Sequence, residues 1–85
     1  MSTNPESLGR ADDEIVTLLS HWLTRQLGND ELRRKVEEIG TDELAPAQRE
    51  AVNELLGELR NAAPGERGPL ELVVRETVET LVYGS

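Results

Sequence analysis

Four stretches of the chain repeat apolar residues at helical spacing, and short polar segments separate them. In the first stretch, a step of 100° per residue places six residues on one face of a helix: Ile15, Leu18, Leu19, Trp22, Leu23 and Gln26. Acidic residues 12–14 begin it, where negative charge favours the helix dipole. Gly28 follows as the expected residue after the C-cap. The pattern predicts a helix over about 12–27.

Two further helices are predicted over 30–39 and 46–61. The second has a narrow apolar stripe, with Asn29 as the expected N-cap and Gly40 as its stop. Pro46 suits the first position of the third helix, and residues 41–45 form a short linker before it. The broad apolar face of this third helix comprises Ala47, Ala51, Val52, Leu55, Leu56 and Leu59.

The last stretch, 69–83, is rich in β-branched residues, so a strand is an alternative to a helix. At helical spacing the inward half is Leu70, Val73, Val74, Thr77, Val78, Leu81 and Val82, and the glutamates fall outside it. A strand here has no second strand to satisfy its backbone groups. We therefore predict a helix that starts at Pro69 and stops at Gly84.

These elements predict an all-α fold, a compact bundle of four helices in a single domain over residues 11–85. Residues 1–10 are polar and aperiodic, and we expect them to form a flexible tail. With 36% hydrophobic residues, the chain is too apolar for obligatory disorder. Its aliphatic core is thin, so a homodimer is a possible further source of stability.

The net charge of −8 argues against two classes of partner. Nucleic acids and anionic lipid surfaces both repel an acidic protein, so neither a nucleic acid nor a membrane is expected. No apolar run approaches the roughly 20 residues of a membrane span. The polar start of the chain lacks the apolar region of a signal peptide, and we expect a cytoplasmic protein. Eight arginines against one lysine indicate a GC-rich, bacterial coding sequence.

The residues that usually carry catalysis are scarce. The chain has no cysteine, and its single histidine, His21, lies on the polar face of the first predicted helix, where we expect it to be solvated. No glycine-rich phosphate loop or calcium loop occurs, and residues 64–68 read as a connector. We therefore predict no enzyme, no catalytic or metal-binding residue and no cofactor.

Two groups of residues are candidates for binding another protein. Glu50, Glu54 and Glu58 recur every four residues and form an acidic ridge, which is either a solvated face or a docking stripe for a basic partner. Leu72 and Tyr83 project outward on one side of the last helix, which suggests either that the N-terminal tail packs on them or that they form an interface with another chain. The basic run 33–35 is followed by Glu37 and Glu38 and is expected to be neutralised by them.

A small acidic adaptor, regulator or accessory subunit fits these features best. One alternative is a carrier domain, because the chain resembles acyl carrier proteins in size, acidity and helix number. That resemblance implies a phosphopantetheine serine within Asp-Ser-Leu, but the only Ser-Leu is Ser7-Leu8 in the predicted tail, and Ser20 falls in mid-helix. A second alternative is an acidic inhibitor of a nucleic-acid-binding protein.

Overall fold

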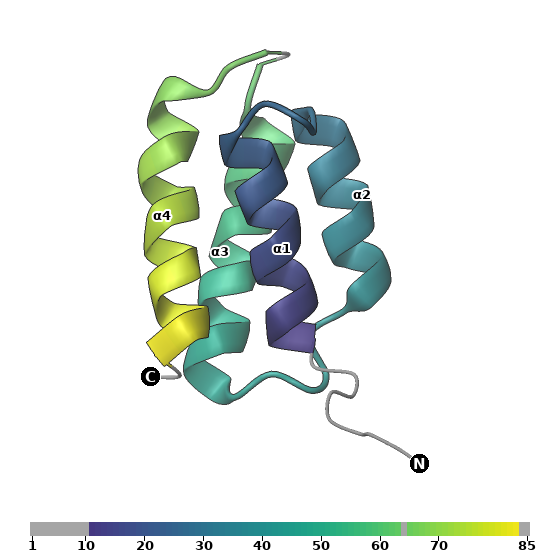
Figure 1. Ribbon diagram of the computed structural model, residues 1–85, viewed down its shortest axis with the longest axis vertical. Coiled ribbons are helices and arrows are strands. Elements are labelled where there is room, and N and C mark those ends of the chain that lie inside the picture. The colour runs from purple at the N-terminus through teal and green to yellow at the C-terminus, as the bar shows by residue number, and fades with distance from the viewer. Residues whose placement is uncertain (1–10, 64, 84–85) are drawn as a thin grey trace.

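The computed structural model describes residues 11–63 and 65–83, which form an all-α bundle (Figure 1). Its helices are α1 (Ala11–Leu23), α2 (Asn29–Ile39), α3 (Pro46–Asn61) and α4 (Gly68–Tyr83). They run alternately up and down, so each packs against its neighbours in sequence, and α1 packs against α4 to close the ring. The predicted fold class is confirmed, and the last stretch is a helix rather than a strand. The predicted tail at 1–10 and the stop at Gly84 lie outside the described residues.

The core is aliphatic around a single large aromatic side chain. Trp22 is completely buried, and every helix contributes to the cluster around it. The buried apolar residues are Ala11, Ile15, Leu19, Trp22, Leu32, Val36, Leu44, Val52, Leu55, Leu56, Leu59, Leu70, Val74 and Leu81. Leu44 belongs to the segment that the sequence pattern left as a linker. None of the helices in the described part of the chain is long and apolar enough to cross a membrane.

Helix α1 ends at Leu23, four residues before the predicted end. Arg25 adopts a left-handed conformation with φ of 68°, and it closes the helix in the way that a glycine usually does. The Arg25 amide donates to the Trp22 carbonyl at 3.0 Å, and the Gln26 amide donates to the His21 carbonyl at 2.7 Å. These are the two hydrogen bonds of a Schellman motif. The expectation that Gly28 ends this helix is wrong, because Arg25 takes that position.

Gly28 instead precedes α2 as its N-cap, where Asn29 was predicted. Asn29 is the first residue of the helix, and its side chain has two other partners. Its Oδ1 accepts a hydrogen bond from Trp22 Nε1 at 2.7 Å, and its Nδ2 donates to the carbonyl of Glu66 at 2.8 Å. The buried indole N–H is thereby satisfied, and the α1–α2 connection is bonded to the α3–α4 connection.

Arg67 makes two short hydrogen bonds at the same end of the bundle. Its Nη1 donates to the carbonyl of Trp22 and its Nη2 to the carbonyl of Leu27, both at 2.6 Å. The guanidinium carbon lies 4.3 Å from the centroid of the Trp22 ring, which is a cation–π distance. The positive charge also faces the carboxyl end of α1, where the helix dipole favours a cation. We call the contacts among Trp22, Leu27, Asn29, Glu66 and Arg67 the Arg67 latch.

The opposite end of the bundle is held by Gln48. Its side chain is buried, and its Oε1 accepts from the amide of Ala45 at 3.0 Å, next to Pro46 at the start of α3. Its Nε2 donates to the carbonyl of Leu81 near the end of α4 at 3.1 Å. This pair of bonds satisfies both polar groups of the amide and fixes the antiparallel register of α3 and α4.

Replacing Arg67 with methionine tests the latch. The Arg67→Met variant keeps an unbranched side chain but removes both hydrogen bonds from the charged group. Hydrogen bonds to charged groups contribute about 1.5–3 kcal/mol, and we expect the free energy of unfolding to fall by that order. Urea unfolding followed by circular dichroism measures the change. Arg75→Met, at an exposed position of α4, is the control and should change stability by less than about 0.5 kcal/mol; equal losses in the two variants would rule out the latch.

The left-handed backbone at Arg25 predicts a stabilising substitution. A side chain in this conformation costs about 1–2 kcal/mol, and glycine avoids the cost. Arg25→Gly should therefore raise the free energy of unfolding by about 1 kcal/mol. Gly40 has φ of 81° at the end of α2, so Gly40→Ala should have the opposite sign. Thermal unfolding of both variants measures the two effects, and a destabilised Arg25→Gly variant would contradict this assignment.

Candidate functional site

The exposed apolar side chains of the bundle gather on α4. Leu72 is 64% exposed, Val82 60% and Tyr83 78%. Leu72 and Tyr83 are eleven residues apart, or about three turns, so they share one side of the helix. Their outward positions are as predicted.

Val82 departs from the prediction, which placed it on the inner face. The core-facing residues of α4 are Leu70, Val74, Thr77 and Leu81, and they form a narrow stripe. Val82 lies about 100° around the helix from Leu81 and falls outside that stripe. It therefore adds a third exposed apolar side chain at the carboxyl end of α4.

Two glutamates fall between Leu72 and Tyr83 on the same side of α4. Glu76 and Glu79 are both exposed, one turn and two turns after Leu72. Their place on the outer side of the helix follows from the sequence pattern, but they are not among the predicted interface residues. The signal for including them was present, because the same projection that aligned Leu72 with Tyr83 places both glutamates between them.

The acidic ridge of α3 is exposed along its whole length, and its Glu58 end lies on the flank toward α4. Glu58 shares a small cleft of about 110 Å³ with Pro69 and Leu70 at the start of α4. The opposite flank of α3 faces α2, since Arg60 Nη2 contacts Glu37 Oε2 at 2.8 Å. Glu54 and Glu50 lie one and two turns before Glu58, and each step of four residues turns about 40° from the α4 flank toward the outer side of α3.

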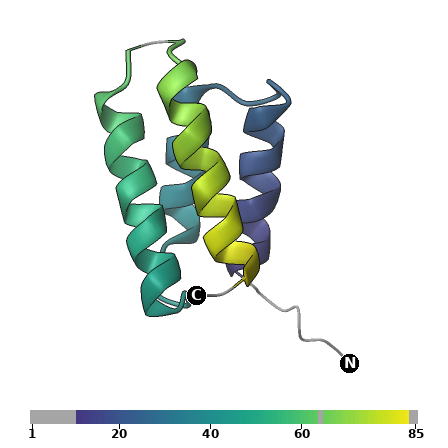
Figure 2. The same cartoon turned by 90° about the vertical axis from the view of Figure 1, so that its left-hand side faces the viewer.

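These two sets of residues lie on the outer sides of two adjoining helices, a surface that the sequence alone did not show. In Figure 2, α4 faces the viewer and α3 runs beside it. Gln48, near the start of α3, is bonded to Leu81, so the end of α4 that carries Tyr83 lies beside the start of α3. Glu58 lines a cleft with Leu70, so the end of α4 that carries Leu72 lies beside the end of α3. We call this surface the α3–α4 face and define it by its exposed residues: Glu50, Glu54, Glu58, Leu72, Glu76, Glu79 and Tyr83.

The basic side chains near α3 are directed away from the α3–α4 face. Arg49 donates to the carbonyls of Thr41 and Leu44 in the α2–α3 connection, each at 3.4 Å. Arg60 pairs with Glu37, and Arg67 is held in the latch. On α4, Arg75 lies about 120° around the helix from Pro69, which marks the α3 flank. Arg75 is exposed one turn after Leu72 and one turn before Glu79, about 60° and 40° around the helix from them, so this basic side chain borders the α3–α4 face.

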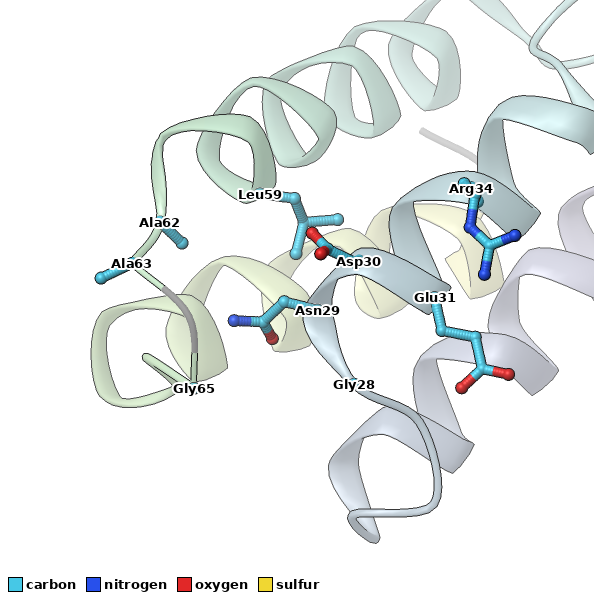
Figure 3. Close-up of a pocket in the computed structure, with 9 residues that line it drawn as sticks. All are labelled: Gly28, Asn29, Asp30, Glu31, Arg34, Leu59, Ala62, Ala63 and Gly65. Carbon is cyan, nitrogen blue, oxygen red and sulfur yellow. The ribbon is translucent and has the colours of Figure 1, made fainter.

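The largest cleft lies elsewhere, at the start of α2 (Figure 3), and has a volume of about 560 Å³. It is lined by Gly28, Asn29, Asp30, Glu31, Arg34, Leu59, Ala62, Ala63 and Gly65. Asn29 points toward the segment around Gly65, whereas Glu31 and Arg34 point away from it. The Asn29 amide is already bonded to Trp22 and Glu66, so it is committed to the fold. The cleft therefore lacks a free set of converging polar groups of the kind that defines a ligand site.

His21 is exposed on α1, as predicted. Across the described ranges, no group of three or more His, Cys, Asp or Glu residues is placed to hold a metal ion. Ser20, the one serine among the described residues, lies inside α1 rather than at a helix start.

Comparison with protein-family models, curated proteins and solved structures gives no match to this chain.

Glu37 of α2 takes part in both ion pairs of the described residues. One is with Arg33 of the same helix, and the other is with Arg60 on the flank of α3 that faces α2. The hydrogen bond from Arg60 holds the pKa of Glu37 below its ordinary value, with Arg33 Nη1 adding positive charge at 3.2 Å. The predicted pairing of Arg33 with Glu37 is thus observed, whereas no ion pair joins Arg34 to Glu38 within the described residues. Arg60 and Arg33 both serve this contact, which keeps them on the side of the bundle away from α4.

This geometry predicts a change in the titration of Glu37. Arg60→Met should raise the Glu37 pKa toward its ordinary value, as measured by carbon NMR of the side-chain carboxyl group. The folded-state pKa is depressed, so the contact stabilises the protein above the unfolded-state pKa and is lost as pH falls through the folded-state pKa. Arg49→Met should leave the Glu37 pKa unchanged. A shift of equal size in both variants would contradict the assignment to Arg60.

Proposed function

We propose that this protein is a small, non-enzymatic adaptor, regulator or accessory subunit that binds another protein through the α3–α4 face. The observation that carries the proposal is the exposure of two apolar residues, Leu72 and Tyr83, on an outer side of the bundle where acidic side chains outnumber basic ones. Exposed apolar residues gathered on one face favour a protein interface. The charge favours a partner with a basic surface, since complementary charge speeds association and excludes wrong partners.

The two alternatives account for less of this surface. A carrier domain needs an attachment serine at a helix start, and Ser20 lies within α1. An acidic inhibitor of a nucleic-acid-binding protein would use the glutamates, because they can take the place of phosphates in a basic groove. Leu72 and Tyr83 have no role in that contact, and they favour a partner with apolar pockets. A cytoplasmic location remains part of the proposal.

Reversing the charge of the ridge tests this function. A variant with Glu50→Lys, Glu54→Lys and Glu58→Lys should lose its partner, because like charges brought together at an interface cost several kcal/mol. We expect affinity to fall by at least about tenfold, which corresponds to about 1.4 kcal/mol. The measurement is quantitative mass spectrometry of proteins captured from the native host, followed by affinity measurement with each captured protein in purified form.

The control reverses three exposed acids elsewhere, Glu31→Lys, Glu38→Lys and Asp42→Lys. It has the same net charge as the ridge variant, so a partner that only senses total charge is lost from both. A specific partner is retained by the control, is lost from the ridge variant and is released from the unmodified protein by salt. Equal capture by the ridge variant and the unmodified protein would remove the proposed role of the ridge.

A further inference from the structure

The outer side of α4 has an ordered pattern along its length. Leu72 and Tyr83 lie at its two ends, and Glu76 and Glu79 lie between them. At 1.5 Å per residue, the eleven-residue separation places the apolar ends about 16 Å apart along the helix. We call these four residues the α4 row.

Helix α3 extends the acidic part of the pattern sideways. Its ridge runs antiparallel to the α4 row, with Glu58 at the end nearer Leu72 and Glu50 at the end nearer Tyr83. Packed helices lie about 8–10 Å apart, which is within the width of one further helix laid over both. A helix in that position would meet carboxylates from α3 and α4 along its middle and an apolar side chain near each end.

We propose that the element bound by the α3–α4 face is a basic amphipathic helix with an apolar side chain at each end of its contact surface. This inference rests on the proposed function and specifies its partner. The apolar residues of the partner are about three helical turns apart, to match Leu72 and Tyr83. Its lysine or arginine residues lie between them and meet Glu76 and Glu79. Apolar anchors at both ends fix the position of the helix, and the charges fix which helix is accepted.

A second copy of this chain is a poorer occupant of the same surface. Two α4 rows paired antiparallel would set Leu72 against Tyr83 of the other copy, but they would also set Glu76 against Glu79. Like charges facing each other in an interface are strongly unfavourable. An anionic membrane surface meets the same objection, because its headgroups repel the glutamates.

The test uses a synthetic alanine-based helical peptide with leucines three turns apart and lysines between them. A second peptide has the same composition in scrambled order. Each is titrated into the full-length protein labelled with nitrogen-15, and NMR chemical shifts report both the affinity and the surface contacted. We expect saturable binding of the patterned peptide, with shifts on α4 and the adjoining side of α3, and binding at least about tenfold weaker for the scrambled peptide.

Variants of the α4 row separate the apolar contribution from the charged one. Leu72→Gln with Tyr83→Gln, and separately Glu76→Lys with Glu79→Lys, should each weaken binding of the patterned peptide by about tenfold or more. Val82→Gln is the matched control, because Val82 is exposed on α4 but lies outside the row; it should retain affinity within about twofold. Circular dichroism of each variant establishes that the bundle is intact.

Several outcomes would overturn this inference. Equal binding of the two peptides, or normal binding by the Leu72→Gln and Tyr83→Gln variant, would show that charge alone is recognised. A dimer of the unmodified protein that this variant abolishes would assign the row to a second copy, and co-sedimentation with phosphatidylcholine vesicles would assign it to a membrane. If partner capture depends on the ridge but the patterned peptide fails to bind, the helix inference falls and the proposed function stands.

Discussion

The contacts of Arg67 with Trp22 and Leu27 join the α3–α4 connection to the end of α1 and to the α1–α2 connection. The guanidinium group of Arg67 stacks on the indole ring and donates to two carbonyls, one at the end of α1 and one in the α1–α2 connection. The same residue begins α4, because its own carbonyl accepts a hydrogen bond from the amide of Glu71 at 2.9 Å. One side chain therefore sets where α4 starts relative to α1. The position of the α4 row on the surface follows from that start.

The bundle distributes its polar groups unequally between its sides. Arg33 and Arg60 pair with Glu37, and Arg49 donates to backbone carbonyls, so these arginines are used within the protein. No ion pair of the described residues involves a glutamate of α3 or α4. The exposed Leu72 and Tyr83 are the reason that we base the proposed function on the α3–α4 face rather than on the larger cleft at the start of α2.

The sequence predicted the helices well because apolar periodicity is a local property. It also placed Leu72 and Tyr83 outside correctly, since one helix decides their direction. It missed Arg67, whose bond to Trp22 joins residues 45 apart in the chain, and it treated the surrounding residues as a connector. A buried indole needs an acceptor for its N–H group. This requirement could have predicted a polar partner for Trp22, the role that Asn29 fills. That the ridge and the α4 row share one face required the packing of α3 against α4.

Native-state hydrogen exchange of Arg67→Met tests most directly whether the latch joins the two connections. Three amides report on the latched end: Gln26, Leu32 and Glu71, all bonded to backbone carbonyls there. The amides of Gly40 and Leu44 report on the other end. Our account predicts that the substitution lowers protection at Gln26, Leu32 and Glu71 together and more than at the other end. Loss of protection at Glu71 alone, with Gln26 and Leu32 unchanged, would contradict it.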